Sequence, residues 1–204
     1  MWRDQVLRSP KLYLGHEWNA DGLHSLVLEI IRIAADAHTA NDCTTVATTL
    51  WHNGSLLVED DGRGLPVEIV RPWDDATLSG PALELVLTVI FERHPDRHYH
   101  EQYGFLNYMG VMLNTVAARL EIDTYTERQW YRVVCAQGAV LQPLDLIEAP
   151  QPCGTRIAFW PDPLVFGTAR FDAQRLREGI GQLAQTYPQV NFRLHDENEA
   201  TIAS

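Results

Sequence analysis

The sequence predicts an α+β fold, a two-layer sandwich in which helices cover one face of a mixed, mostly antiparallel sheet. Two observations lead to this prediction. Apolar residues recur at helical spacing in several long stretches, and short runs rich in threonine and valine lie between them. One amphipathic layer of helices packed on one face of a sheet buries both kinds of apolar surface.

The first clear helix is expected from about Leu23 to His38. Asp21 is the expected N-cap, because a short polar side chain at this position can accept a hydrogen bond from the first free amides. Glu29, Ile33 and Asp36 share one face of this helix, which marks that face as a place to look for chemistry. The apolar positions that predict the helix are Leu23, Leu26, Val27, Ile30, Ile31 and Ala34.

A β-hairpin is expected next. Thr44–Trp51 and Leu56–Glu59 resemble strands, and the turn His52-Asn53-Gly54-Ser55 joins them. The motif EDDGRGLP, residues 59–66, therefore leaves the end of a strand. The other expected elements are helices at Pro81–Phe91 and Met109–Leu120, a loop at Arg93–Tyr103, strands at Glu121–Thr126, Trp130–Cys135 and Arg156–Trp160, a helix near Asp172–Tyr187, and a last strand at Val190–His195.

The bulk composition excludes several classes of protein. The 204 residues, 46% hydrophobic and 21% charged, predict a single globular domain over residues 1–204. A membrane helix needs about 18 consecutive apolar residues, and the chain has no such run. The N-terminus lacks the apolar segment of a secretory signal, so we expect a cytoplasmic protein with no membrane partner. The net charge of -11 disfavours nucleic acid as a partner, because that affinity comes largely from basic side chains at phosphates.

Five motifs in order give the chain a family resemblance. They are LYLG (12–15), GLHSLVLEI (22–30), EDDGRGLP (59–66), GTRIAFWPD (154–162) and RLREGIGQLA (175–184). From about Arg8 to Asp196 the chain resembles the N-terminal ATPase domain of bacterial gyrase B and of topoisomerase IV. These belong to the GHKL superfamily and have the Bergerat fold. The resemblance implies the same fold, with a pocket of the nucleotide-binding type.

The resemblance also implies that the metal side of this pocket has changed. Glu29 matches the glutamate that activates water for attack on the γ-phosphate. Ile33 stands where the family has an asparagine that holds Mg²⁺, and Arg32 replaces the acidic residue before it. A hydrocarbon side chain has no oxygen with which to ligate a hard cation. We therefore expect no metal, no cofactor and no efficient ATP hydrolysis.

The base side of the pocket matches the family closely. Asp60 corresponds to the aspartate that accepts the adenine amino group, and Thr155 to the threonine that assists it. The glycines of EDDGRGLP, Gly64 among them, let the backbone approach the base. Further matches are Arg63 and Pro66 at the pocket mouth and Arg132 near the aminocoumarin-antibiotic subsite.

The phosphate side departs from the family. Where several glycines are expected, the segment YGFLNYMG (103–110) carries bulky side chains. Tyr103, Phe105 and Tyr108 are either core aromatic residues or an apolar wall that suits a less charged ligand. His94, His98 and His100 are interpreted as part of a solvated loop, with a metal site as the alternative. We expect the chain to lack the family's transducer domain and N-terminal dimer arm, so a homodimer would not use that arm.

Three functions remain open. The leading hypothesis is that the pocket binds a small organic molecule and transforms it by metal-free acid/base chemistry: isomerisation, dehydration or cyclisation, as in specialised metabolism. Glu29 and Asp60 would be catalytic, and Arg63 or Arg132 would orient an anionic oxygen. One alternative is a pseudo-ATPase that binds an adenine nucleotide or an aminocoumarin-like ligand. The last is residual Mg²⁺-dependent ATPase activity, with Asp36 as a substitute metal ligand.

Simpler interpretations also exist for these carboxylates. Glu29 could be a solvent-facing helix residue without a role. Asp60 and Asp61 could stabilise a turn, because aspartate side chains do so without any ligand. The full motif together with Thr155 favours a ligand role for Asp60.

Overall fold

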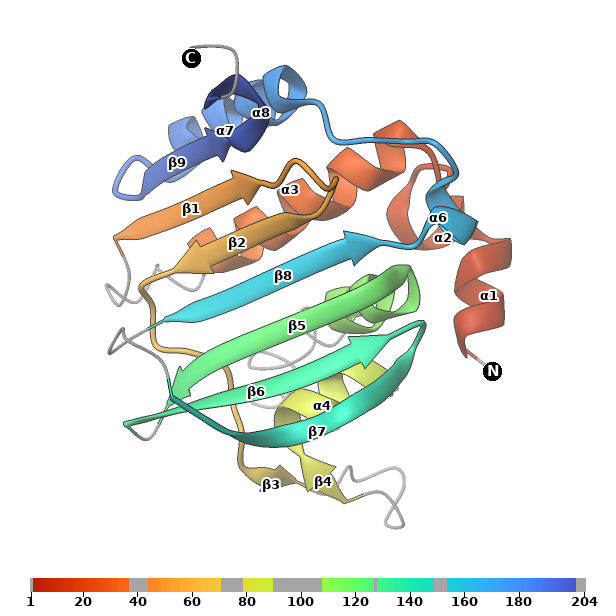
Figure 1. The fold of residues 1–204 in the computed structure, drawn as a ribbon, viewed down its shortest axis with the longest axis vertical. Helices are drawn as coiled ribbons and strands as arrows, with labels where there is room; N and C mark the ends of the chain where they lie inside the picture. Colours follow the sequence, from red (N-terminus) through yellow and green to blue (C-terminus); the bar gives the residue numbers. More distant parts are fainter. Residues whose placement is uncertain are drawn as a thin grey trace.

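The computed structural model has two layers, a large sheet and a set of helices (Figure 1). It describes residues 2–36, 44–70, 79–89, 108–126, 128–148 and 154–200. The seven-stranded sheet has the order β7-β6-β5-β8-β2-β1-β9. Its neighbouring strands are antiparallel except for β1 and β9, which are parallel. The predicted α+β fold with a mixed, mostly antiparallel sheet is confirmed.

The strands of the large sheet are β1 (Thr45–Leu50), β2 (Leu56–Asp60), β5 (Ala117–Thr126), β6 (Gln129–Ala136), β7 (Ala139–Ile147), β8 (Thr155–Pro161) and β9 (Asn191–Asp196). Two short strands, β3 (Ile69–Val70) and β4 (Gly80–Pro81), pair with each other. The helices are α1 (Trp2–Arg8), α2 (Pro10–Leu14), α3 (Ala20–Asp36), α4 (Ala82–Thr88), α6 (Pro163–Phe166), α7 (Ala173–Thr186) and α8 (Glu197–Ala200). Residues 108–115 are also helical.

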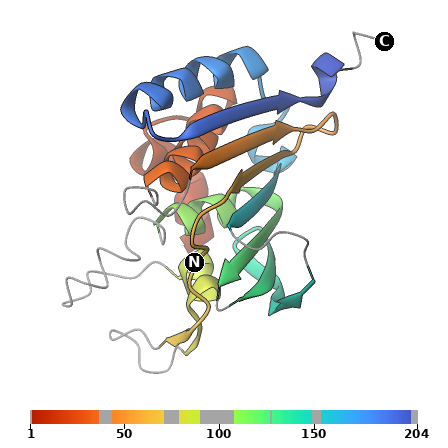
Figure 2. The same cartoon turned by 90° about the vertical axis from the view of Figure 1, so that its left-hand side faces the viewer.

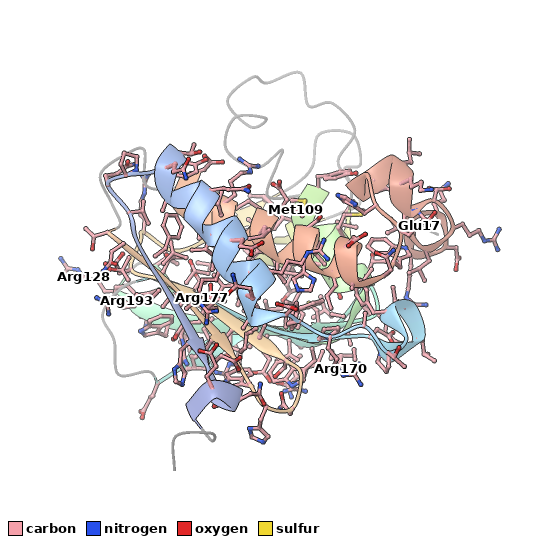
Figure 3. All side chains as sticks on the ribbon, turned by 90° about the horizontal axis from the view of Figure 1, so that it is seen from above. Glu17, Met109, Arg128, Arg170, Arg177 and Arg193 are labelled. Atoms are coloured by element: carbon pink, nitrogen blue, oxygen red, sulfur yellow. The ribbon has the colours of Figure 1, made fainter. Side chains whose placement is uncertain are left out.

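Helices α3, α4 and α7 lie on the same side of the large sheet (Figures 1 and 2). α3 packs against β1 and β2, and α4 packs against β7. Seen from above, α7 and α3 lie side by side, and side chains fill the space between the helices and the strands (Figure 3). The main hydrophobic core is therefore on this side of the sheet, which we call the inner face.

α3 is the helix predicted at Leu23–His38, and its apolar stripe is buried as expected. Its N-cap is Asn19 and not Asp21: the Asn19 side-chain oxygen accepts hydrogen bonds from the amides of Asp21 (2.9 Å) and Gly22 (3.1 Å). Asp21 lies inside the first turn and forms an ion pair with Arg175 of α7 (2.7 Å). The helix starts earlier than predicted because the cap lies two residues upstream.

A buried histidine joins α3 to the start of α7. His24 is 2% exposed, and its Nε2 accepts a hydrogen bond from the amide of Asp172 (2.8 Å). Its Nδ1 then carries the proton and donates to the carbonyl of Ala20 (2.6 Å). Asp172 in turn caps α7 by accepting from the amide of Arg175 (2.9 Å). The neutral imidazole is thus fully satisfied in a place that water does not reach.

Several predicted boundaries were wrong. The helix expected at Met109–Leu120 ends near residue 115, and β5 begins at Ala117. β7, with Pro143 inside it, was not predicted as a strand, and α1, α2, α6 and α8 were not predicted either. The predicted hairpin, the other strands and the helix at α7 are confirmed. Among the described residues, no helix is long and apolar enough to span a bilayer.

Candidate functional site

The two faces of the sheet separate the predicted site residues into two groups. Leu56 and Val58 of β2 belong to the inner core, so Asp60, which follows them at a spacing of two, also faces inward. The same alternation places Thr155 of β8 and Thr124 of β5 on the inner face, in line with core residues of their strands. Asp60, Thr155 and Thr124 are direct partners across three neighbouring strands. They form one polar row at the edge of the core.

Asp60 ends β2 with its carboxylate largely removed from water. Its Oδ1 accepts a hydrogen bond from the amide of Gly62 (2.9 Å), and Thr155 contributes further hydrogen bonds. Burial raises the pKa of Asp60 to about 6, and the negative charge of Asp61 acts in the same direction. The hydrogen bonds oppose this shift but do not cancel it. Near neutral pH this carboxyl group therefore exchanges readily between its two protonation states.

The loop after Asp60 is held by its own polar groups. Asp61 accepts hydrogen bonds from the amides of Thr44 (2.8 Å) and Thr45 (2.9 Å), which fixes the start of β1. These amides lie 17 and 16 residues away, so Asp61 ties the loop to β1 and does not close a turn of its own. The turn role considered in the sequence belongs to Asp60, whose Oδ1 accepts from the amide two residues on, but Asp60 also contacts Thr155 on another strand.

Gly64 and Leu65 bind the loop to β5. Gly64 has a φ of +81°, and a Cβ at this position would lie 2.1 Å from the Tyr125 carbonyl oxygen. The amide of Leu65 donates to Thr124 Oγ1 (2.5 Å). Only glycine tolerates both the conformation and the close approach. Arg63 is exposed and Pro66 is partly buried.

Glu29 lies on α3 and is not a free carboxylate. Its Oε2 accepts from Arg32 Nε (2.8 Å), and Arg32 Nη1 also donates to Asp36 Oδ2. Asp36 Oδ1 accepts from the hydroxyl of Tyr187, a buried residue that follows α7. The predicted face of α3 is therefore a partly exposed network in which one guanidinium bridges two carboxylates. Ile33, on the same helix, packs against the hydrophobic core.

The residues of this face do not fit a bound Mg²⁺ ion. Magnesium requires nearly octahedral oxygen coordination. Ile33 has no oxygen, and the Arg32 guanidinium already engages Glu29 and Asp36. No cluster of three metal-ligating side chains occurs in the part of the chain that the structure describes. The substitute ligand Asp36 is thus committed to Arg32 and Tyr187.

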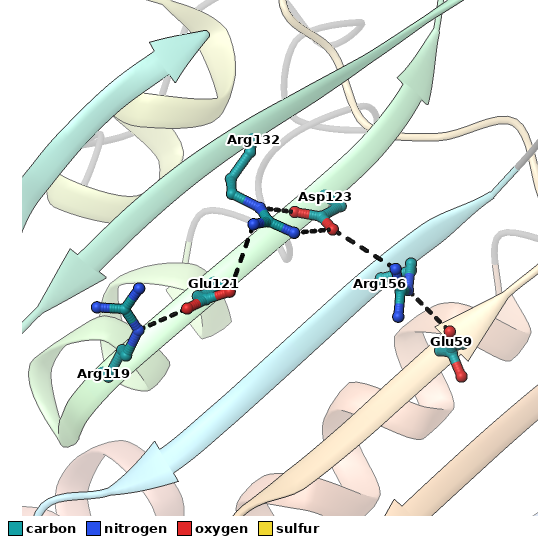
Figure 4. Close-up of polar contacts among 6 residues, drawn as sticks. All are labelled: Glu59, Arg119, Glu121, Asp123, Arg132 and Arg156. Carbon is teal, nitrogen blue, oxygen red and sulfur yellow. Dashed lines mark hydrogen bonds and ion pairs between the residues drawn. The ribbon is translucent and has the colours of Figure 1, made fainter. Parts of the chain in front are cut away.

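Arg132 does not lie with Asp60. It projects from the outer face of the sheet, the face away from the helices, because it alternates with the inward-facing Val133 of β6. There its Nε and Nη2 donate to Asp123 Oδ1 (2.6 Å) and Oδ2 (2.8 Å), as Figure 4 shows. This pairing raises the pKa of the Arg132 guanidinium. Arg132 and Asp60 therefore lie on opposite faces of the sheet, and the role of Arg132 toward a ligand stays a prediction.

Tyr108 lies at the start of the helical residues 108–115 and faces α2. Its hydroxyl donates to the carbonyl of Tyr13 (2.5 Å), and the two rings stack with centroids 6.3 Å apart. This contact agrees with the simpler interpretation of Tyr108 as a packed aromatic residue. Tyr103 and Phe105 lie outside the described residues, as do His94, His98 and His100.

Comparisons with known proteins place this geometry in a family, although no family model matches the chain. The solved 43K ATPase domain of Thermus thermophilus gyrase B, in complex with an aminocoumarin, superimposes with a TM-score of 0.79 and 29% identity, over 95% of this chain and 48% of that one. The B subunit of the type 2 topoisomerase of Aquifex aeolicus is 30% identical over 196 residues, which are 95% of this chain and 24% of the relative. The chain is a homologue of the N-terminal ATPase domain of gyrase B.

Other gyrase B proteins give the same result. The Thermus thermophilus protein is 31% identical over 183 residues, which are 88% of this chain and 28% of that protein. The chain thus spans about a quarter of the length of these curated relatives. The predicted resemblance is confirmed, and this homologue has the fold of a GHKL-type nucleotide-binding domain.

Some residues of the site in this homologue were not predicted. Thr124, which binds the glycine loop, lies in a predicted strand, but its contact depends on strand register. Arg32 was described only as the replacement of an acidic residue, and its ion pairs were not predicted. They could have been predicted, because Arg32 lies three residues after Glu29 and four before Asp36 on one helix. Asp123 lies in none of the five motifs, and Arg156 lies in GTRIAFWPD but was given no role there.

Proposed function

We propose that this domain binds a small, weakly charged organic molecule through Asp60 and Thr155, without a metal ion. The observation that carries the proposal is the contrast between the two sides of the site. The Asp60 carboxylate is desolvated and paired with Thr155, whereas Glu29 and Asp36 are both engaged by the single guanidinium of Arg32. Asp60 and Thr155 keep the side chains that the resemblance to gyrase B assigns to binding of the base. A metal ion that carries a triphosphate would have to compete with Arg32 for the carboxylates of the α3 face.

The chemistry of Asp60 suits a ligand with a polar edge. In its ionised form the carboxylate accepts hydrogen bonds from N–H or O–H groups, and in its protonated form it also donates one. Because its pKa is about 6, a ligand can select either form at little cost near neutral pH. An adenine-like heterocycle matches this requirement, and so does an aminocoumarin-like compound of the kind bound in the Thermus structure.

Proton transfer is the second candidate function, and the pKa of Asp60 favours it. A carboxyl group whose pKa lies near the working pH is an effective general acid or base. Glu29 accepts a hydrogen bond from the Arg32 guanidinium, which holds its carboxylate in a fixed orientation for such a step. An isomerisation, dehydration or cyclisation needs no metal for such a step. Glu29→Gln would reduce turnover of such a substrate, and unchanged turnover would exclude a catalytic Glu29.

Calorimetric titration tests the binding proposal. Adenosine, AMP and ATP are titrated into the domain with Mg²⁺ and again with a chelator, in parallel with Asp60→Asn. Asp4→Asn serves as the matched control, because Asp4 is an exposed carboxylate on α1. We expect adenosine or AMP to bind equally with and without Mg²⁺, and binding to weaken in Asp60→Asn alone. Tight ATP binding that requires Mg²⁺ would contradict the proposal.

A gain-of-function variant sharpens this test. Ile33→Asn together with Arg32→Asp restores oxygen groups where the gyrase B resemblance places the metal ligand and the acidic residue before it. If lost oxygen ligands are the reason for metal independence, the double variant should acquire Mg²⁺-dependent ATP binding. No change in the double variant would show that other parts of the site also exclude the triphosphate.

A further inference from the structure

The outer face of the sheet carries a continuous chain of ion pairs across four strands. Arg156 Nε of β8 donates to Glu59 Oε1 of β2 (2.8 Å), and Arg156 Nη1 lies 3.8 Å from Asp123 Oδ2 of β5. Asp123 also receives the bidentate hydrogen bonds from Arg132 of β6. Figure 4 shows these four side chains in sequence. We call Glu59, Arg156, Asp123 and Arg132 the outer network.

The outer network lies directly behind the inner polar row. Glu59 precedes Asp60, Arg156 follows Thr155, and Asp123 precedes Thr124 along their strands. Glu59 is the cross-strand partner of Arg156, just as Asp60 is the partner of Thr155. Successive residues of a strand point to opposite faces, so each ion pair fixes the strands one residue away from an inner site residue.

This position matters because two of the strands end here. β2 ends at Asp60 and β8 begins at Thr155, so the regular pairing of the two strands ends at the site. Gly154 approaches Asp60 so closely that a Cβ would lie 1.8 Å from the Asp60 carbonyl oxygen. Strand ends fray unless side chains hold them. The ion pair of Glu59 and Arg156 supplies such a constraint one pair before the last, which is Asp60 with Thr155.

The central carboxylate is committed to the outer network. Asp123 is 4% exposed and contacts the guanidinium groups of Arg132 and Arg156. These two arginine side chains are themselves partly exposed to solvent. A nearly buried charge keeps its position only when its partners are placed well. Asp123 therefore couples β6 to β8 through a residue that has no access to the inner face.

We propose that the outer network positions Asp60, Thr155 and Thr124 from the opposite side of the sheet, and that Arg156 is its principal positioning residue. Arg156 acts on the site through Thr155 and the end of β2, without touching the ligand. The inference rests on the proposed role of Asp60, but it concerns the geometry of the free protein. It also gives Arg132 a role on the outer face.

The test is the titration of Asp60 in the free protein, followed by the carboxyl ¹³C signal in NMR spectra. Arg156→Gln removes the two contacts of Arg156 and keeps a polar side chain. Loss of positioning admits water to Asp60 and also weakens the Thr155 hydrogen bonds, which lower its pKa. Burial is the largest cause of the raised pKa, so its relief outweighs the lost hydrogen bonds, and the pKa should fall from about 6 toward the ordinary value of 3.8. Simple removal of a nearby positive charge would raise this pKa instead. The sign of the change therefore separates positioning from a direct charge effect.

Arg119→Gln is the matched control. Arg119 forms an ion pair with Glu121 (2.5 Å) on β5, and Glu121 also lies 3.9 Å from Arg132 Nη1, so this variant disturbs the far end of the ion-pair chain without removing a contact of Arg156 or Asp123. Its removal should leave the pKa of Asp60 unchanged. Arg156→Lys, which keeps the charge but loses the planar two-partner geometry, should give an intermediate fall and serves if Arg156→Gln does not fold.

An unchanged or raised pKa of Asp60 in folded Arg156→Gln would overturn the proposal, and so would an equal fall in Arg119→Gln. Binding of adenosine is then measured in the same variants, and Arg156→Gln should weaken it by about tenfold or more because the polar row is displaced. Failure of the wild type to bind adenosine would bear on the proposed function alone, since the titration needs no ligand.

Discussion

Replacing Asp60 with asparagine should stabilise the protein at neutral pH. Asparagine keeps the shape of the side chain and an oxygen that can accept from the amide of Gly62, but it carries no charge to desolvate. The wild-type carboxyl group is neutral in both states at low pH. As pH rises through 3.8 it ionises in the unfolded chain, but in the folded protein it resists ionisation until about pH 6.

The size of the effect follows from this difference. A group whose folded-state pKa is raised costs stability at high pH, because the unfolded chain releases its proton first. The interval from 3.8 to about 6, at about 1.4 kcal/mol per pH unit, corresponds to roughly 3 kcal/mol. The destabilisation by Asp60 should begin near pH 4, reach about half its value near pH 5 and be complete above pH 6 to 7.

Urea unfolding of both proteins from pH 4 to pH 8 measures this difference. Other titrating groups are common to the two proteins and cancel in the comparison. We expect the free energy of unfolding of Asp60→Asn to exceed that of the wild type by a margin that grows with pH and then becomes constant. A difference that is the same at pH 4 and pH 8, or a wild type that is more stable at pH 8, would refute the reasoning. A residue that destabilises the fold in this way is typical of a binding site.

The remaining predictions concern the loop, the α3–α7 contact and metal dependence. Gly64→Ala should lower the free energy of unfolding by about 2 kcal/mol or more, because the added Cβ would collide with the Tyr125 carbonyl oxygen at a positive φ. Gly181→Ala is the control, because Gly181 lies on the open surface of α7. It should raise the free energy of unfolding by about 0.5 to 1 kcal/mol in the same thermal or urea assay. His24→Ala should cost about 2 kcal/mol or more, because it leaves the amide of Asp172 without its buried acceptor; amide exchange at the start of α7 should speed up accordingly, and unchanged exchange would argue against this link. Addition of a chelator should leave the melting temperature unchanged, because a guanidinium already occupies the carboxylates of α3; a clear fall would reveal a bound metal.

The fold could be predicted where the sequence pattern is local. The spacing of Leu26, Ile30 and their neighbours is enough to place α3, and two short strand-forming runs joined by the turn at residues 52–55 are enough to place β1 and β2. The pattern failed where two periodicities overlap. The stretch from Met109 to Leu120 is largely buried, so the point at which helix changes to strand is set by packing and not by composition. β7 was missed because Pro143 and exposed residues disguise an edge strand.

The candidate site was only partly predictable for a related reason. Motifs identified Asp60, Gly64 and Thr155. The roles of Asp60 and Gly64 follow from the turn after β2, and that of Thr155 from its pairing with Asp60 on the neighbouring strand. The face on which a strand residue points depends on register, and one residue decides between the inner row and the outer network. The face on which Arg132 lies could therefore not be predicted, and the structure turns it outward. The ion pairs of Arg32 depend on rotamers as well as spacing, which sequence reasoning does not resolve.

The parallel pairing of β9 with β1 has a consequence for how the chain folds. Asn191 of β9 pairs with Thr45 of β1, so the last strand completes a sheet whose neighbouring strand was made almost 150 residues earlier. Closing so long a loop is entropically unfavourable until many other contacts exist. During synthesis β1 must therefore remain an open edge, with its backbone groups unpaired on one side, until residues 191–196 emerge. β1, whose start is fixed by Asp61, therefore obtains its second neighbouring strand only at this late stage.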